Sequence, residues 1–348
     1  MVRNRVRNLA TAACLIAVMA GSARAQDAVA SFYKGRNVTI IVGSSPGGGY
    51  DLYARLLSRF MSKHIPGNPT MVVQNMPGAA SNVAASYVYN VAPKDGTVLG
   101  GLFMGAVLDP LLGDGKRITH DVSKFNFIGN ANSDAYVCII RTDAAVKTMA
   151  DVFDRELVVG ASADGASTRD FPLLLKNLLG AKLKVVAGYP GTREINLALE
   201  KGEVQGACGV AWSSISANYP GWFKDNLVKP LVQEANSGYP ELDRQGVPLA
   251  RQFAKTDEQR RVLDFMYTQT AFGRPYVAAP GVPAERIAAL RKAFMDTMKD
   301  PELLAEAKRI NLDVGPISGE DLQAQVAKLY ATPADLVEKA KAAVAFKP

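Results

Sequence analysis

The most constraining stretch of this sequence covers residues 38–55, where a short apolar run passes through a glycine-rich turn into a helical pattern. The β-branched run at 38–42 is typical of a strand covered on both faces in a parallel sheet. After the turn at 44–49, apolar residues recur at helical spacing, which predicts a helix beginning near Gly49 or Tyr50. Glycines and the free N–H groups of a first helical turn suit an anion, so the turn is either an anion-binding loop or a flexible connection.

Three motif-based hypotheses for this turn fail. Residues 43–47 match the G-x-S-x-G nucleophile elbow of hydrolases, with Ser45 at the nucleophile position. The residue after that serine must donate its N–H to the oxyanion hole, and here it is Pro46, which has no N–H. The glycines are also followed by neither the Gly-Lys-Ser/Thr of a P-loop nor the spacing of a Rossmann fingerprint. A secreted serine hydrolase using Ser45 is therefore an alternative that the sequence disfavours.

Residues 1–25 have the three parts of a secretory signal peptide. Three arginines precede an apolar stretch at 9–20, and Ala23-Arg24-Ala25 forms a small-x-small cleavage site. The apolar stretch is shorter than the roughly 20 residues that span a bilayer. The sequence therefore predicts export of the chain, with cleavage after Ala25.

The charge and cysteine content narrow the function classes. Four of the 40 basic residues and none of the 33 acidic residues lie in the predicted signal peptide, which leaves a net charge of about +3. The basic residues are scattered, which argues against nucleic-acid and membrane-surface binding. Cys138 and Cys208 remain after cleavage, and they either pair or stay as two buried thiols in strands. Two cysteines without a nearby histidine predict no metal site.

Strand–loop–helix units repeat along the chain. After the first unit, a strand at 70–74 leads through a turn at 75–82 into a helix at 83–91. A second set starts with a strand at 156–161 and a Gly/Ser-rich loop at 162–168. Further strands are expected at 98–104, 124–129, 136–141, 183–187, 204–208 and 227–232, with helices at 171–179, 193–201 and beyond 283. This alternation predicts an α/β protein whose parallel sheets carry binding loops at the strand ends.

Short motifs stand in a fixed order along nearly the whole chain after the signal peptide. They are Pro46-Gly47-Gly48, Asp51 with Ala54-Arg55, Asn75 with Pro77-Gly78-Ala79 and Asn82, Ala92 with Asp95-Gly96, and Tyr189-x-Gly191 with Leu199-x-x-Gly202-x-Val204. Together they resemble the substrate receptors of tripartite tricarboxylate transporters, the Bug-type extracytoplasmic solute receptors.

The resemblance implies a type II periplasmic binding protein of the Venus-flytrap kind, in which each of two lobes is a mixed, mostly parallel sheet flanked by helices. It implies that lobe 1 comprises residues 26–130 and 273–348, and lobe 2 residues 131–272. It further implies a periplasmic monomer that is no enzyme, uses no cofactor and delivers its ligand to integral-membrane permease subunits. A ligand-sensing receptor for a membrane signalling partner is the alternative within this class.

In the family, a small carboxylate lies between two loops of lobe 1, and lobe 2 closes over it. The candidate ligand-binding residues all lie in glycine- or hydroxyl-rich loops before helices: Ser44, Ser45, Gly47, Gly48, Ser81 and Asn82 in lobe 1, and Ser162, Ser167, Thr168, Tyr189 and Thr192 in lobe 2. Four or five charge-assisted hydrogen bonds of about 1.5–3 kcal/mol each suffice for micromolar binding without a catalytic group. Asp51 is expected to brace its own helix, because a free carboxylate would repel an anion.

Three departures from the family pattern leave the ligand open. Ala80-Ser81 stands where Gly-Gly is common, Arg169-Asp170 stands where a histidine is frequent, and Tyr50 replaces a small hydroxyl residue. A guanidinium at Arg169 is suited to pair a distal carboxylate, although a solvated arginine at a helix start is the simpler interpretation. The ligand class predicted is a small organic acid: a di- or tricarboxylate, an aromatic acid or an acidic amino acid.

Overall fold

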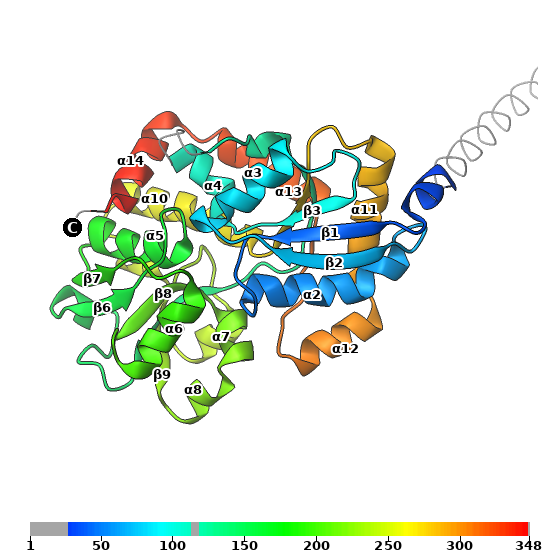
Figure 1. The fold of residues 1–348 in the computed structure, drawn as a ribbon. Coiled ribbons are helices and arrows are strands. Elements are labelled where there is room, and N and C mark those ends of the chain that lie inside the picture. Colours follow the sequence, from blue (N-terminus) through cyan, green and yellow to red (C-terminus); the bar gives the residue numbers. More distant parts are fainter. Residues whose placement is uncertain (1–26, 113–117, 347–348) are drawn as a thin grey trace, which may run out of the picture.

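The computed structural model describes residues 27–112 and 118–346 of the chain. Within them, two mixed β-sheets are each flanked by helices (Figure 1). The first sheet has the strand order β11-β4-β10-β3-β1-β2 and the second the order β7-β6-β8-β5-β9. We call the first sheet with its helices lobe 1 and the second with its helices lobe 2. The predicted two-lobed α/β class is confirmed, while the predicted signal peptide lies outside the described residues.

Lobe 1 is organised on its parallel strands β1, β2 and β3. Its strands are β1 (Asn37–Val42), β2 (Thr70–Asn75), β3 (Val98–Gly101), β4 (Asn126–Asn130), β10 (Pro275–Ala278) and β11 (Ile317–Ser318). Its helices are α2 (Gly49–Met61), α3 (Asn82–Asn90), α4 (Gly105–Leu112), α11 (Ala284–Thr297), α12 (Pro301–Arg309) and α13 (Gly319–Tyr330). The β-branched residues of β1 are buried because helices cover both faces of the sheet, and α2 begins at Gly49 as the sequence predicts.

Lobe 2 combines parallel strands β6, β7 and β8 with antiparallel β5. Its strands are β5 (Tyr136–Arg141), β6 (Leu157–Gly160), β7 (Leu183–Val186), β8 (Gly206–Ala211) and β9 (Val228–Gln233). Its helices are α5 (Ser167–Leu173), α6 (Thr192–Lys201), α7 (Trp212–Asn218), α8 (Pro220–Lys224), α9 (Pro240–Arg244) and α10 (Asp257–Tyr267). The strand expected at 204–208 extends to Ala211, because Gly209 adopts a left-handed φ of 65° at a bulge instead of ending the strand.

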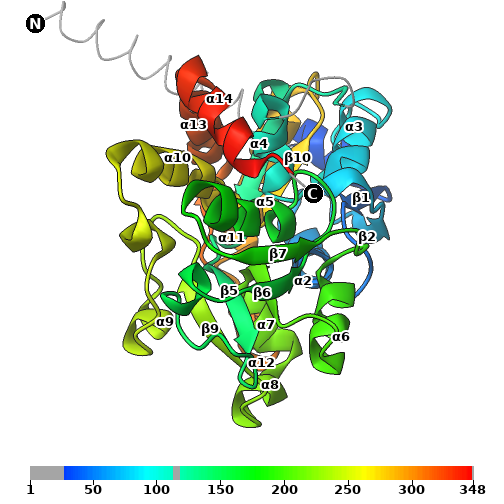
Figure 2. The same cartoon turned by 90° about the vertical axis from the view of Figure 1, so that its left-hand side faces the viewer.

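Within the described residues, the chain crosses between the lobes twice before it reaches its C-terminal helix. It leaves lobe 1 after β4 and enters lobe 2 at β5, and it returns just before β10. The C-terminal helix α14 (Ala334–Val344) packs on α5 and α10 of lobe 2 as well as on α4 of lobe 1. Figure 2 shows α14 beside α4, with α10 close by. All strands of lobe 2 lie between residues 130 and 273, and all strands of lobe 1 lie outside this range. The exact lobe boundaries stay a prediction.

Cys138 of β5 and Cys208 of β8 form a disulfide. Both residues are fully buried, and they face each other at the bulge between the two neighbouring strands. Of the two possibilities that the sequence left open, the structure therefore has the paired one. The bond joins two strands in the middle of the lobe 2 sheet.

Replacing Cys138 and Cys208 together by alanine is expected to lower the free energy of unfolding by about 2–4 kcal/mol, because the disulfide restricts the unfolded chain over a separation of 70 residues. Urea unfolding of the chain from Gln26 onward measures the difference. Adding reductant to the native sequence should lower its midpoint toward that of the double variant. A midpoint that is the same for all three samples contradicts the disulfide.

Candidate functional site

A cavity of about 470 Å³ lies between the two lobes, and we call it the cleft. The loops after β1, β2 and β3 line it from lobe 1, and the loops after β6 and β7 together with α7 line it from lobe 2. Figure 1 shows the arrowheads of β1 and β2 directed toward lobe 2, as expected where parallel strands carry binding loops at their carboxyl ends. The predicted site residues in its wall are Ser44, Ser45, Gly47, Gly48, Ser81, Ser162, Ser167, Thr168 and Thr192.

Asp51 fixes the shape of the glycine loop. Its buried carboxylate accepts hydrogen bonds from the backbone N–H of Gly47, from Arg55 Nε and from Asn75 Nδ2, each at 2.8 Å. Asn75 also donates to the carbonyl of Ser44 at 3.0 Å. Burial acts to raise the pKa of Asp51, but these donors outweigh it and hold the pKa below its ordinary value. Asp51 therefore braces its helix and loop as expected, and the N–H of Gly47 is already occupied.

The second lobe 1 loop adopts an unusual backbone. Gly78 has a φ of 141°, and Ala79, Ala80 and Ser81 follow with φ values of 45°, 51° and 77°. A left-handed conformation costs an ordinary residue roughly 1–2 kcal/mol, so three in succession store strain at the wall of the cleft. The turn brings Ser81 against the first loop so closely that a Cβ on Gly43 would overlap its Oγ.

Two hydroxyl groups of these loops are left without partners. Ser44 Oγ and Ser81 Oγ are buried, and neither forms a hydrogen bond with any described residue. A buried hydroxyl without a partner costs about 1–3 kcal/mol. The first N–H groups of α2 also have no partner within the helix. Lobe 1 thus holds several unpaired polar groups in residues that line the cleft.

In the lobe 2 wall, by contrast, three predicted hydroxyl groups already have hydrogen-bond partners. The hydroxyls of Ser162 and Thr168 lie 2.6 Å apart and form a hydrogen bond, and Ser167 donates to the carbonyl of Gly209 at 2.8 Å. Helix α6 begins at Thr192, so its positive end faces the cleft. The lobe 2 hydroxyls can therefore contact a ligand by rearranging these bonds.

Two predicted site residues do not reach the cleft wall. Asn82 donates instead to the carbonyl of Ala79 at 2.9 Å and to Asp109 Oδ2 at 2.6 Å, so it holds the second loop from behind. The ring of Tyr189 is partly buried and packs beside Gly160 against the hydrophobic cluster of lobe 2. The hypothesis that Arg169 meets a ligand is not supported either, because its guanidinium lies 3.0 Å from Asp164 and outside the cleft wall.

The sequence analysis missed Arg274, which lines the cleft from the second crossing. Its guanidinium is buried and pairs with Asp134 of the first crossing at 2.9 Å. Burial alone would lower the pKa of Arg274, but the neighbouring carboxylate of Asp134 raises it by more than that. The pKa therefore lies above its ordinary value, and the group stays charged. An isolated arginine between glycine and proline carries no sequence signal, and only the fold brings it to the cleft.

An aromatic wall completes the cleft beside Arg274. The rings of Tyr50 and Phe103 stack with centroids 4.4 Å apart. The hydroxyl of Tyr50 lies 3.3 Å from that of Tyr136 and accepts a hydrogen bond from the N–H of Met104 at 3.2 Å. Tyr50 thus gives the cleft a fixed, ring-sized surface.

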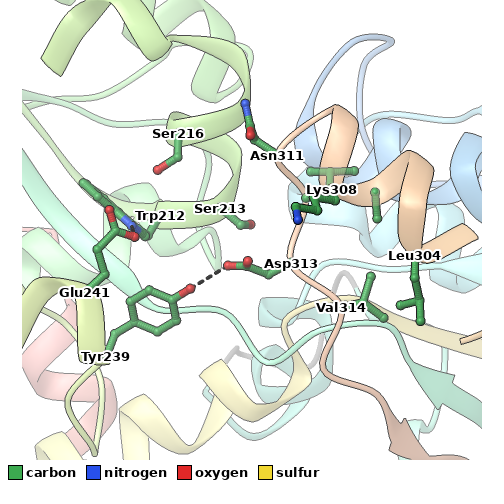
Figure 3. Close-up of a pocket in the computed structure, with 12 residues that line it drawn as sticks. Trp212, Ser213, Ser216, Tyr239, Glu241, Leu304, Lys308, Asn311, Asp313 and Val314 are labelled. Carbon is green, nitrogen blue, oxygen red and sulfur yellow. Dashed lines mark hydrogen bonds between the residues drawn. The ribbon is translucent and has the colours of Figure 1, made fainter. Parts of the chain in front are cut away.

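A second cavity, of about 480 Å³, lies between α7 and α9 of lobe 2 and the segment from α12 to Val314 in lobe 1. Figure 3 shows Tyr239 donating to Asp313 across it, at 2.6 Å. Its wall contains two carboxylates, those of Glu241 and Asp313, and none of the predicted site residues. With Lys308 as its cation, this wall has one more acidic than basic side chain, whereas the cleft wall has Arg193 and Arg274 against Glu194. The cleft is therefore the better candidate site for an organic acid.

Residues 27–112 and 118–346 contain neither a cluster of metal-binding side chains nor a helix of membrane-spanning character. Within these ranges, no group of three or more His, Cys, Asp and Glu side chains is placed to hold a metal ion. Over the same residues, no helix combines the length and apolar character needed to cross a bilayer.

Comparisons with known proteins agree with the fold. No protein-family model matches the chain. A UPF0065 protein of Bordetella bronchiseptica is 27% identical over 206 residues, which cover 57% of this chain and 55% of that protein, so the match spans about half of the relative's length.

Solved structures match over nearly their whole length. The periplasmic binding protein BugD has a TM-score of 0.70 at 22% identity, covering 88% of this chain and 98% of its own. MatC of Rhodopseudomonas palustris, solved with malate, has a TM-score of 0.67 at 21% identity, covering 87% and 99%. An R. palustris protein solved with adipate has a TM-score of 0.66 at 21% identity, covering 88% and 97%. The predicted fold and the resemblance to Bug-type receptors are thereby confirmed.

Asp51→Asn is expected to lower the free energy of unfolding by about 1–3 kcal/mol at neutral pH, because the ionised carboxylate organises the loop. Since the pKa of Asp51 is lowered in the folded protein, its stabilisation is complete above the ordinary value of 3.8 and is lost as the pH falls through the lowered pKa. Urea unfolding of both proteins between pH 3 and pH 7 measures this. A difference that is the same at both ends contradicts the bracing role.

Proposed function

We propose that this chain is a periplasmic solute receptor of the tripartite tricarboxylate type. It binds a small carboxylate-containing metabolite in the cleft through backbone amides and Ser/Thr hydroxyls, and it delivers this ligand to the membrane subunits of the transporter. The domain boundaries, the cleavage site and the monomeric state predicted from the sequence belong to the same proposal.

The observation that carries the proposal is the set of unpaired polar groups in the lobe 1 wall. Ser44 and Ser81 line the cleft, and their Oγ atoms are buried without a partner among the described residues. The free N–H groups at the start of α2 lie in the same wall. Donors grouped at a helix N-terminus favour an anion, because the helix dipole adds to their hydrogen bonds.

The solved relatives support the same ligand class. MatC contains malate and the R. palustris protein of similar fold contains adipate, and both ligands are small organic acids. A cavity of about 470 Å³ is of the size that ligand pockets of small molecules have. The aromatic wall of Tyr50 and Phe103 offers an apolar surface to the carbon skeleton of such an acid.

A serine hydrolase would need a catalytic base beside Ser45, and neither histidine of the chain is placed there. His64 is held by Asp300, with 2.8 Å between Nε2 and Oδ2, and His120 lies 3.2 Å from the hydroxyl of Ser86. Neither histidine lines the cleft. Since Pro46 also removes the required N–H donor, a binding role is the better interpretation of this loop.

The proposal predicts that one or more acids of a defined panel raise the melting temperature of the purified chain from Gln26 onward. The panel contains succinate, malate, adipate, citrate, benzoate and glutamate, with the corresponding amides as uncharged controls. A shift with an acid and none with its amide supports the proposal. If no acid in the panel shifts the melting temperature, the proposal is wrong.

Ser44→Ala should separate binding from stability. Because its hydroxyl has no partner among the described residues, the variant is expected to unfold at the same or a slightly higher temperature. Its affinity for the best acid of the panel should fall roughly 10-fold or more, which isothermal titration calorimetry measures. Ser58→Ala on α2, whose hydroxyl bonds the carbonyl of Arg55 away from the cleft, serves as the control.

A further inference from the structure

Arg274 lies in the layer of side chains between the cleft and the second cavity, which we call the partition. It follows the second crossing, lines the cleft, and is among the largest side chains that the structure fully buries. The two serines at the start of α7 lie on opposite sides of this partition, since Ser214 lines the cleft and Ser213 lines the second cavity. The guanidinium of Arg274 bonds Ser214 at 2.9 Å and lies 3.4 Å from the hydroxyl of Ser213.

The hydrogen bonds of the guanidinium can be counted. Arginine has five N–H donors and no acceptor. Nη1 donates to the carbonyl of Gly273 at 2.7 Å and to the hydroxyl of Tyr136 at 3.4 Å. Nη2 donates to Asp134 Oδ2 and to Ser214 Oγ, each at 2.9 Å. The fifth donor, Nε–H, is buried and has no partner among the described residues.

The position of Arg274 is fixed by stacking as well as by these bonds. Its guanidinium carbon lies 4.6 Å from the ring centroid of Tyr50 and 4.9 Å from that of Tyr53, both on the first turns of α2. Asp134 is in turn satisfied by the backbone N–H and the hydroxyl of Ser213. A donor that is held so firmly and left unpaired is placed for a partner that arrives later.

The surroundings favour a negatively charged partner. The guanidinium approaches the N-terminus of α2, where a Cβ built on Gly49 would lie 3.3 Å from Nη2. A 13-residue helix directs its positive end to this point. Asp134 balances the charge of the guanidinium, while its unpaired Nε–H remains a charge-assisted donor for a carboxylate oxygen.

We propose that Arg274 is a ligand-contacting residue of the cleft, whose Nε–H together with the hydroxyl of Ser214 receives a carboxylate oxygen of the bound acid. This inference rests on the proposed function. Arg274 then determines specificity for the charged form of the ligand, because an amide or ester offers a weaker acceptor to a fixed guanidinium. The same contact ties the ligand to both chain crossings through Asp134.

Arg274→Lys tests the contact directly. Lysine keeps a positive charge beside Asp134 but has no donor at the position of Nε. The dissociation constant of the best acid of the panel is expected to rise roughly 10- to 100-fold, while weak binding of its amide changes little. Calorimetric titrations of both compounds against both proteins give the acid-to-amide ratio, which a merely structural role of Arg274 would leave unchanged.

Three further variants keep the test valid if Arg274→Lys does not fold. Ser214→Ala and Ser216→Ala are matched changes on the same helix, and only Ser214 lines the cleft. Ser214→Ala is expected to weaken acid binding several-fold, and Ser216→Ala to leave it as in the native sequence. Arg274→Gln combined with Asp134→Asn removes the ion pair without leaving a buried unpaired charge, and it should lose acid binding as Arg274→Lys does.

The outcomes separate this inference from the proposed function. Absence of acid binding by the native sequence overturns the proposed function, and the inference falls with it. Native binding that persists with an unchanged acid-to-amide ratio in the Arg274 variants overturns the inference alone. Equal weakening by Ser214→Ala and Ser216→Ala also overturns it, because the effect then does not depend on the cleft.

Discussion

The buried ion pair between Arg274 and Asp134 is the interaction on which the arrangement of the two lobes depends. Moving two charges out of water is costly, and the cost is recovered only where the geometry and the remaining hydrogen bonds are nearly complete. Here one charge lies on each chain crossing, and Ser213 and Tyr136 of lobe 2 supply further bonds. Both crossings are therefore fixed relative to each other, and the pair separates the cleft from the cavity behind it.

The two lobes present their polar groups to the cleft in different ways. In lobe 1, Asp51 uses the N–H of Gly47 to hold the loop, while the hydroxyls of Ser44 and Ser81 remain unpaired. In lobe 2, Ser162 and Thr168 satisfy each other. A ligand thus gains most from lobe 1 without breaking existing bonds. This difference supports a receptor in which lobe 1 provides the first contacts and lobe 2 adapts to them.

The strained backbone of the turn at 78–81 positions one of the unpaired lobe 1 hydroxyls. Three consecutive residues other than glycine adopt positive φ values, and Asn82 holds them from behind through the carbonyl of Ala79. Without the packing against Gly43, such a turn would relax to an ordinary conformation. As a result Ser81 brings a hydroxyl to the residues of the wall, where a glycine would offer only its backbone.

The sequence by itself determined the α/β class and the loops after β1, β2 and β6, because hydrophobic period and glycine position are local properties that show where strands end and helices begin. It also assigned Asp51 to bracing, since a free carboxylate would repel an anion. The structure supplies the partner at Arg55, four residues further along the helix. Only the tertiary structure decided that Arg274 lines the cleft and that Cys138 meets Cys208. It also turned Asn82 and Tyr189 away from the cleft wall. These outcomes depend on contacts between segments far apart in the chain, and no local pattern encodes which side of a loop a single side chain will face.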